Sequence, residues 1–142
     1  GLTSAPAIAD YAAELLAADG LDLTEKDSCI DSREKVHFNR LSAAERKALI
    51  EKNPAYGRVI CRCETVTEGE ILDAIHSPIP PVSVDGIKRR TGAGMGRCQG
   101  GFCGPRVVDL LARELGVSPL TILQDRDGSE ILTAYTKGEV RA

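Results

Sequence analysis

The chain has 142 residues, 42% of them hydrophobic, and a formal net charge of −3. This length suits one ordinary domain or a small domain with an appendage, and the acidic balance argues against a general nucleic-acid binder. No apolar run approaches the roughly 20 residues that a membrane helix needs, and the first residues lack the basic start of a signal peptide.

The first 57 residues predict a helix and then a linker. The Ala-rich stretch AIADYAAELLAADG has helical spacing and ends at Gly20. We expect this helix, within residues 1–20, to pack against something larger; the alternative is a plain surface helix. Residues 21–57 predict a linker that contains one helix, which begins with a capping box at Ser42 and ends at Asn53-Pro54.

Residues 58–124 predict a compact group of short helices with loops between them. Thr67 and Ser83 are candidate N-caps. The last and best helix has Pro105 in its first turn and ends at Gly116. Residues 125–142 form a polar tail. The fold class is therefore expected to be mainly α.

Four of the five cysteines are clustered in the chain as Cys61-x-Cys63 and, thirty-four residues later, Cys98-x4-Cys103. A disulfide within the first pair would close a strained ring, and C-x-C is uncommon in zinc knuckles. A thiol catalyst needs a nearby base, and neither histidine lies in a partner motif. The odd cysteine count, with Cys29 set apart, favours a reducing and therefore cytoplasmic compartment.

Four thiolates from two loops fit one [2Fe-2S] cluster, which would carry a formal charge of about −2 when oxidised and −3 when reduced. Residues 58–106 hold seven Lys/Arg and five Asp/Glu, a balance of +2, so the remainder of the chain carries −5. Glycines between residues 92 and 101 free backbone N–H groups to face the sulfurs. The basic residues expected to offset the cluster charge are Arg62, Lys88, Arg89, Arg90 and Arg97. A zinc ion held by the same thiolates, in a structural or regulatory module, is the alternative.

Three segments, ICRCETVTEGEILDAI, DGIKRRTGAGMGRCQGGFC and GPRV, resemble the domain of bacterioferritin-associated ferredoxin. The same domain occurs in the C-terminal regions of bacterial FAD-dependent oxidoreductases. The resemblance implies a small helix-turn-helix-type bundle around one [2Fe-2S] cluster. It also implies that the cluster ligands are Cys61, Cys63, Cys98 and Cys103. Gly92 stands where family members often have Arg, which removes one basic side chain and no ligand.

The opening GLTSAPAIADYAAELL resembles the end of a glycerol-3-phosphate dehydrogenase-like FAD domain, where Gly1, Leu2 and Thr3 would lie beside the flavin. No G-x-G-x-x-G follows a strand, so we expect a C-terminal fragment that cannot hold FAD alone. The resemblance implies a non-catalytic electron-transfer module. Its expected partners are the parent FAD domain and an unidentified electron acceptor.

Overall fold

The computed structural model describes residues 1–29, 32 and 34–137, and the chain divides into two compact units, Gly1–Glu34 and Lys35–Ala142. The first unit contains α1 (Ala5–Ala18), which has Pro6 in its first turn and ends just before Gly20, whose φ is +94°. Every side chain of α1 is exposed within this unit. Its large apolar residues, Ile8 and Leu15 among them, therefore face solvent there.

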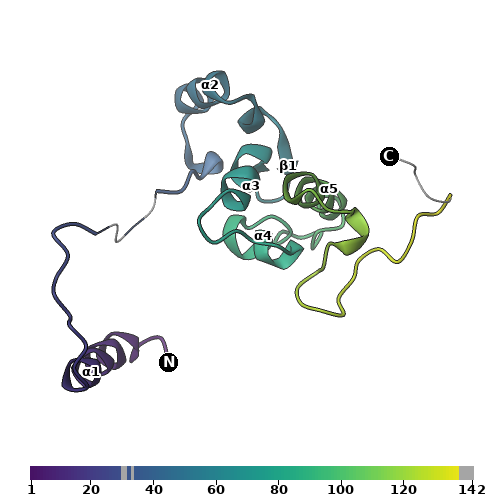
Figure 1. The fold of residues 1–142 in the computed structure, drawn as a ribbon. Helices are drawn as coiled ribbons and strands as arrows, with labels where there is room; N and C mark the ends of the chain where they lie inside the picture. The colour runs from purple at the N-terminus through teal and green to yellow at the C-terminus, as the bar shows by residue number, and fades with distance from the viewer. Residues whose placement is uncertain (30–31, 33, 138–142) are drawn as a thin grey trace. The chain divides into compact units, whose positions relative to one another are not determined.

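The second unit is built mainly from short helices (Figure 1), which confirms the expected fold class. Its helices are η1 (Phe38–Arg40), α2 (Ala43–Lys52), η2 (Pro54–Gly57), α3 (Glu68–Ile75), α4 (Val84–Thr91), α5 (Gly104–Leu115) and η3 (Pro119–Thr121). Its strands are β1 (Val59–Cys61) and β2 (Val66–Thr67). They pair antiparallel with Val59 opposite Thr67 and Cys61 opposite Val66, so Cys61 lies at the end of β1 and Cys63 in the turn that follows it.

The helix ends follow the capping signals of the sequence. Ser42 opens α2 and Thr67 opens α3, each in a complete capping box with the glutamate three residues later. The hydroxyl of Ser83 accepts a bond from the Gly86 N–H at the start of α4. Gly116 ends α5 with a φ of +66°, a left-handed conformation that favours glycine.

The core lies where α3, α4 and α5 meet. Ile71 of α3, Ile87 of α4 and Leu111 of α5 are each fully buried, and Ile122, just after η3, closes the same cluster. Two of the four clustered cysteines, Cys61 and Cys103, belong to this cluster. The cysteine region is therefore anchored on the hydrophobic core rather than attached to the surface.

Residues 38–57, assigned to the linker by the sequence, lie in the same compact unit as the cysteines. Phe38 and Tyr56 are buried. The Phe38 N–H donates to Glu70 at 3.1 Å, and the Tyr56 hydroxyl donates to Asp73. Gly69 faces the Tyr56 ring closely enough that a Cβ there would overlap it. These contacts fix η1 and η2 against α3.

Residues 123–130 also pack on the domain. Leu123 bridges to Ser83 on one side and to Glu130 on the other. Beside this bridge, Arg89 donates to Asp125 at 2.6 Å. Within residues 1–29, 32 and 34–137, no helix is both long and apolar enough to cross a membrane.

Candidate metal centre

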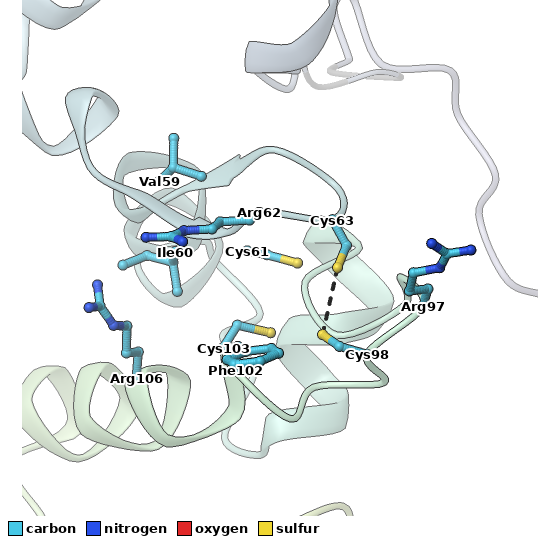
Figure 2. A pocket seen from close by; sticks show the side chains of 10 residues that line it. All are labelled: Val59, Ile60, Cys61, Arg62, Cys63, Arg97, Cys98, Phe102, Cys103 and Arg106. Atoms are coloured by element: carbon cyan, nitrogen blue, oxygen red, sulfur yellow. Dashed lines mark hydrogen bonds between the residues drawn. The ribbon is translucent and has the colours of Figure 1, made fainter.

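Four cysteines from two separate loops face one cavity of about 450 Å³, and Figure 2 shows their sulfurs pointing into it. Cys61 ends β1, and Cys63 lies in the turn toward β2. Cys98 lies in the glycine-rich loop after α4, and Cys103 is the N-cap of α5. The local fold therefore brings together the two pairs that are thirty-four residues apart in the chain.

The sulfurs meet as an inner and an outer pair, each with one cysteine from either loop. In the outer pair, the Sγ atoms of Cys63 and Cys98 are 3.6 Å apart. In the inner pair, Cys61 and Cys103 are adjacent and only 1% and 2% exposed. Among the described residues, no group of three or more His, Cys, Asp or Glu side chains is arranged tightly enough to hold a metal ion without adjustment.

The two pairs differ in their electrostatics. Backbone N–H of Phe102, together with the Cys63 thiol, lowers the pKa of Cys98. Burial raises the pKa of Cys103 to about 11, and the neighbouring Cys61 adds to this effect. A metal ligand must be the thiolate, so binding a metal at the inner pair has to release protons. In the outer pair, the groups around Cys98 instead favour its thiolate form.

The loop that carries Cys98 is shaped by close backbone contacts. A Cβ at Gly96 would overlap the Cβ of Cys63 and lie 3.2 Å from its Sγ. The Gln99 side-chain amide donates to the carbonyls of Met95 and Gly96 at 3.1 and 3.0 Å, which ties the loop to itself. The glycines were a signal in the sequence, whereas Gln99 carried none because its role depends on the folded loop.

The basic residues around the cysteines only partly match the expectation. Arg62 and Arg97 line the cavity, together with Arg106, which the sequence analysis did not single out. Arg89 instead pairs with Asp125 at 2.6 Å, because the tail folds against α4. Lys88 lines a separate small cavity behind the cysteine loop. The basic side chains that line the cavity therefore come from the loops and from α5, and not from the IKRR run.

The other candidate residues belong to other parts of the structure. Cys29 is exposed in the first unit, and Gly1, Leu2 and Thr3 are exposed at its start. His76 caps the C-terminus of α3, and its Nε2 lies 2.9 Å from Glu114. Of the residues that the structure describes, no carboxylate or imidazole lines the cysteine cavity.

The chemistry of the cavity fits an iron–sulfur cluster. Its potential ligands are four thiols, the donor type that holds [2Fe-2S] clusters. Its walls supply backbone N–H donors at Cys98 and three arginine side chains, and these groups stabilise a negatively charged centre.

Comparison with known proteins identifies this segment. Residues 59–113 match the model of the BFD-like [2Fe-2S] binding domain. This segment belongs to that family. The match begins in β1 and ends in α5, so it includes both cysteine loops.

Larger proteins resemble the chain beyond this segment. A glycerol 3-phosphate dehydrogenase of Caloramator mitchellensis is 48% identical over 142 residues, which are 99% of this chain and 30% of that protein. Hydrogen cyanide synthase subunit HcnB of Pseudomonas aeruginosa is 38% identical over 95 residues, 59% of this chain and 20% of that protein. One subunit of the anaerobic glycerol-3-phosphate dehydrogenase of Escherichia coli strain K12 is 36% identical over 66 residues, 46% of this chain and 12% of that protein.

The chain spans less than a third of the length of these curated relatives. No solved structure matches it. The relationship therefore describes a part of larger proteins and does not by itself assign their activities to this chain.

Proposed function

We propose that the chain is an electron-transfer module of an FAD-dependent oxidoreductase similar to glycerol-3-phosphate dehydrogenase. The observation that carries this proposal is the convergence of four cysteines on one cavity inside the BFD-like segment. In this proposal Cys61, Cys63, Cys98 and Cys103 ligate one [2Fe-2S] cluster, which supplies one-electron chemistry when bound. No residue of the chain is assigned a bond-making role.

The protein's own contribution is to hold and tune the centre. Cys61 and Cys103 anchor it to the hydrophobic core, since both side chains are almost fully buried. The backbone N–H groups of Phe102, Gly100 and Gly101 lie around Cys98 and lower the pKa of its thiol. Such donors stabilise the more negative, reduced state and therefore raise a reduction potential. No finding favours zinc at this site.

The electron source in this proposal is a flavin domain that precedes the module in its parent protein. The exposed apolar side chains of α1, including Ile8, Tyr11 and Leu15, are the surface on which that domain would pack. Gly1, Leu2 and Thr3 would then lie beside the flavin. The Caloramator relative, which is similar along almost the whole chain, bears the name glycerol 3-phosphate dehydrogenase. We extend that substrate, and a cytoplasmic location, to the parent protein as part of the proposal.

Metal and sulfide analysis of anaerobically purified protein tests the proposal directly. We expect two iron and two acid-labile sulfide per chain, a visible absorption band bleached by dithionite, and an electron paramagnetic resonance signal in the reduced state. Cys61→Ser and Cys98→Ser should lose the band. The matched control, Cys29→Ser, should keep it, because that thiol lies in the first unit. One zinc per chain without sulfide, or loss of the cluster in Cys29→Ser, would contradict the proposal.

A further inference from the structure

Three arginines surround the cysteine cavity, although the chain as a whole has a net negative charge. Arg62, Arg97 and Arg106 all line the cavity and are exposed to solvent. Within the described residues, none of the three forms an ion pair with a carboxylate. Their guanidinium groups are therefore available to a group outside the chain.

An exposed aromatic ring lies at the same place. Phe102 is 84% exposed, although it lies between two cysteines in the loop. Phe102 is one of the residues that line the cysteine cavity, and Figure 2 shows its ring beside Cys103. Aromatic residues and arginine are the types enriched at the centres of protein interfaces. The exposed phenyl ring and the surrounding arginines therefore have the composition of a protein–protein contact surface.

Charge compensation for the cluster explains the arginines only in part. Compensation of the cluster charge does not require an exposed aromatic ring, yet Phe102 is 84% exposed. A negatively charged cluster by itself would repel an acidic partner. Three guanidinium groups around the cavity add positive charge to the surface that an approaching molecule meets, and such charges raise association rates with acidic partners.

We propose that Arg62, Arg97, Arg106 and Phe102 form a docking surface for an acidic electron-acceptor protein. This inference rests on the proposed function, because it assigns a direction of approach to the same metal centre. The acceptor would place carboxylates against the arginines and an apolar side chain against Phe102. The electron then leaves through the exposed outer side of the site, where Cys63 and Cys98 lie.

A short acidic peptide, Asp-Asp-Asp-Trp-Asp-Asp-Asp, measures binding independently of electron transfer. The chain contains no tryptophan, so the fluorescence anisotropy of the peptide reports only the peptide. We expect binding at low salt that weakens as salt increases. Each of Arg62→Gln, Arg97→Gln and Arg106→Gln should weaken it about two- to fivefold, and Phe102→Ala should weaken it without changing the salt dependence. Arg126→Gln, an exposed arginine in the tail that does not line the cavity, should leave it unchanged.

Two small oxidants of opposite charge test the same surface during electron transfer. Hexacyanoferrate(III) and tris(phenanthroline)cobalt(III) each take one electron and no proton from dithionite-reduced protein. At low salt we expect each arginine substitution to slow oxidation of the protein by the anionic reagent by about two- to fivefold. Oxidation by the cationic reagent should not become slower. Equal effects on both oxidants, or no loss of peptide binding in the triple variant, would overturn the docking surface. A protein without iron and sulfide would overturn the proposed function and this inference together.

Discussion

Gly96→Ala is the sharpest test of how the fold arranges the cysteines. The added methyl group would overlap the Cβ of Cys63 and lie 3.0 Å from a Glu64 carboxylate oxygen. Carbon atoms in contact are about 3.5–4.0 Å apart. Relieving the overlap therefore needs a shift of more than about 1 Å in Cys63 or in the loop, whereas functional sites tolerate about 0.5 Å.

The cost of this substitution depends on whether a cluster is bound. Without one, the Cys63 turn can move aside, because that side chain is exposed and its sulfur contacts the Cys98 sulfur only at 3.6 Å. With a cluster bound, Cys63 is fixed and the overlap has to be absorbed as strain of about 1–3 kcal/mol. This cost corresponds to roughly 5- to 150-fold weaker retention of the cluster.

The assay follows the visible absorption band of anaerobic protein during incubation with an iron chelator. We expect Gly96→Ala to bleach at least fivefold faster than the unsubstituted protein, or to be purified with less than half the iron and sulfide. Gly104→Ala is the matched control, since a Cβ there meets nothing within 4 Å next to Cys103. If Gly96→Ala kept its iron and bleached at the unsubstituted rate, the close packing of this loop on Cys63 would not matter for the cluster.

Three further substitutions address the scaffold. The Glu68 carboxyl is only 8% exposed, and Arg58 and Arg113 hold its pKa below its usual value. The stabilisation that Glu68 contributes is therefore present above pH 4.5 and is lost as the pH falls through the lowered folded-state pKa. Glu68→Gln should therefore cost about 1–2 kcal/mol at pH 7, after allowance for the exposed arginines, and less at pH 3, as measured by denaturant unfolding. Ile122→Ala, which removes a side chain only 2% exposed, should lower the unfolding free energy by about 2–4 kcal/mol in the same measurement. Gln99→Leu removes two loop hydrogen bonds and should cost about 1–2 kcal/mol, with faster chelator bleaching than the unsubstituted protein.

Each of these expectations has an outcome that would contradict it. An equal effect of Glu68→Gln at pH 7 and pH 3 would show that its ion pairs do not set the acid sensitivity. A loss below about 1 kcal/mol for Ile122→Ala would show that Ile122 does not complete the core. Unchanged bleaching in Gln99→Leu would mean that the loop keeps its shape without the amide.

The sequence predicted the helices well because their ends are chemically marked. The capping box at Thr67 and the left-handed glycine at Gly116 are local signals that do not depend on the rest of the fold. The packing of residues 38–57 was harder to predict from the sequence. Phe38 and Tyr56 are single aromatic residues in a polar stretch, and their burial depends on partners in α3 that are far away in the chain.

The candidate site also has parts that could be predicted from the sequence and parts that could not. The cysteine spacing and the glycine content can be read directly from the amino-acid sequence, so the four thiols and the glycine-rich loop could be predicted. The arginines could be predicted only in part: Arg62 and Arg97 line the cavity as expected, whereas the places of Arg89 and Arg106 depend on the folded structure. Arg89 is held by Asp125 through a tail contact, whereas Arg106 reaches the cavity from the first turn of α5 because it follows Cys103 by three residues.

The inner and outer sulfur pairs differ in burial and in electrostatics, and this difference bears on the side from which an electron would leave the site. The inner pair is enclosed by the core, and burial raises the pKa of Cys103 to about 11. The outer pair lies next to solvent, with backbone donors at Cys98 that favour negative charge. In the proposed cluster, groups that favour negative charge at Cys98 would favour an added electron on the outer side. That side is also the one on which Phe102 is exposed, so the groups that stabilise the electron and the surface proposed to pass it on belong to the same loop.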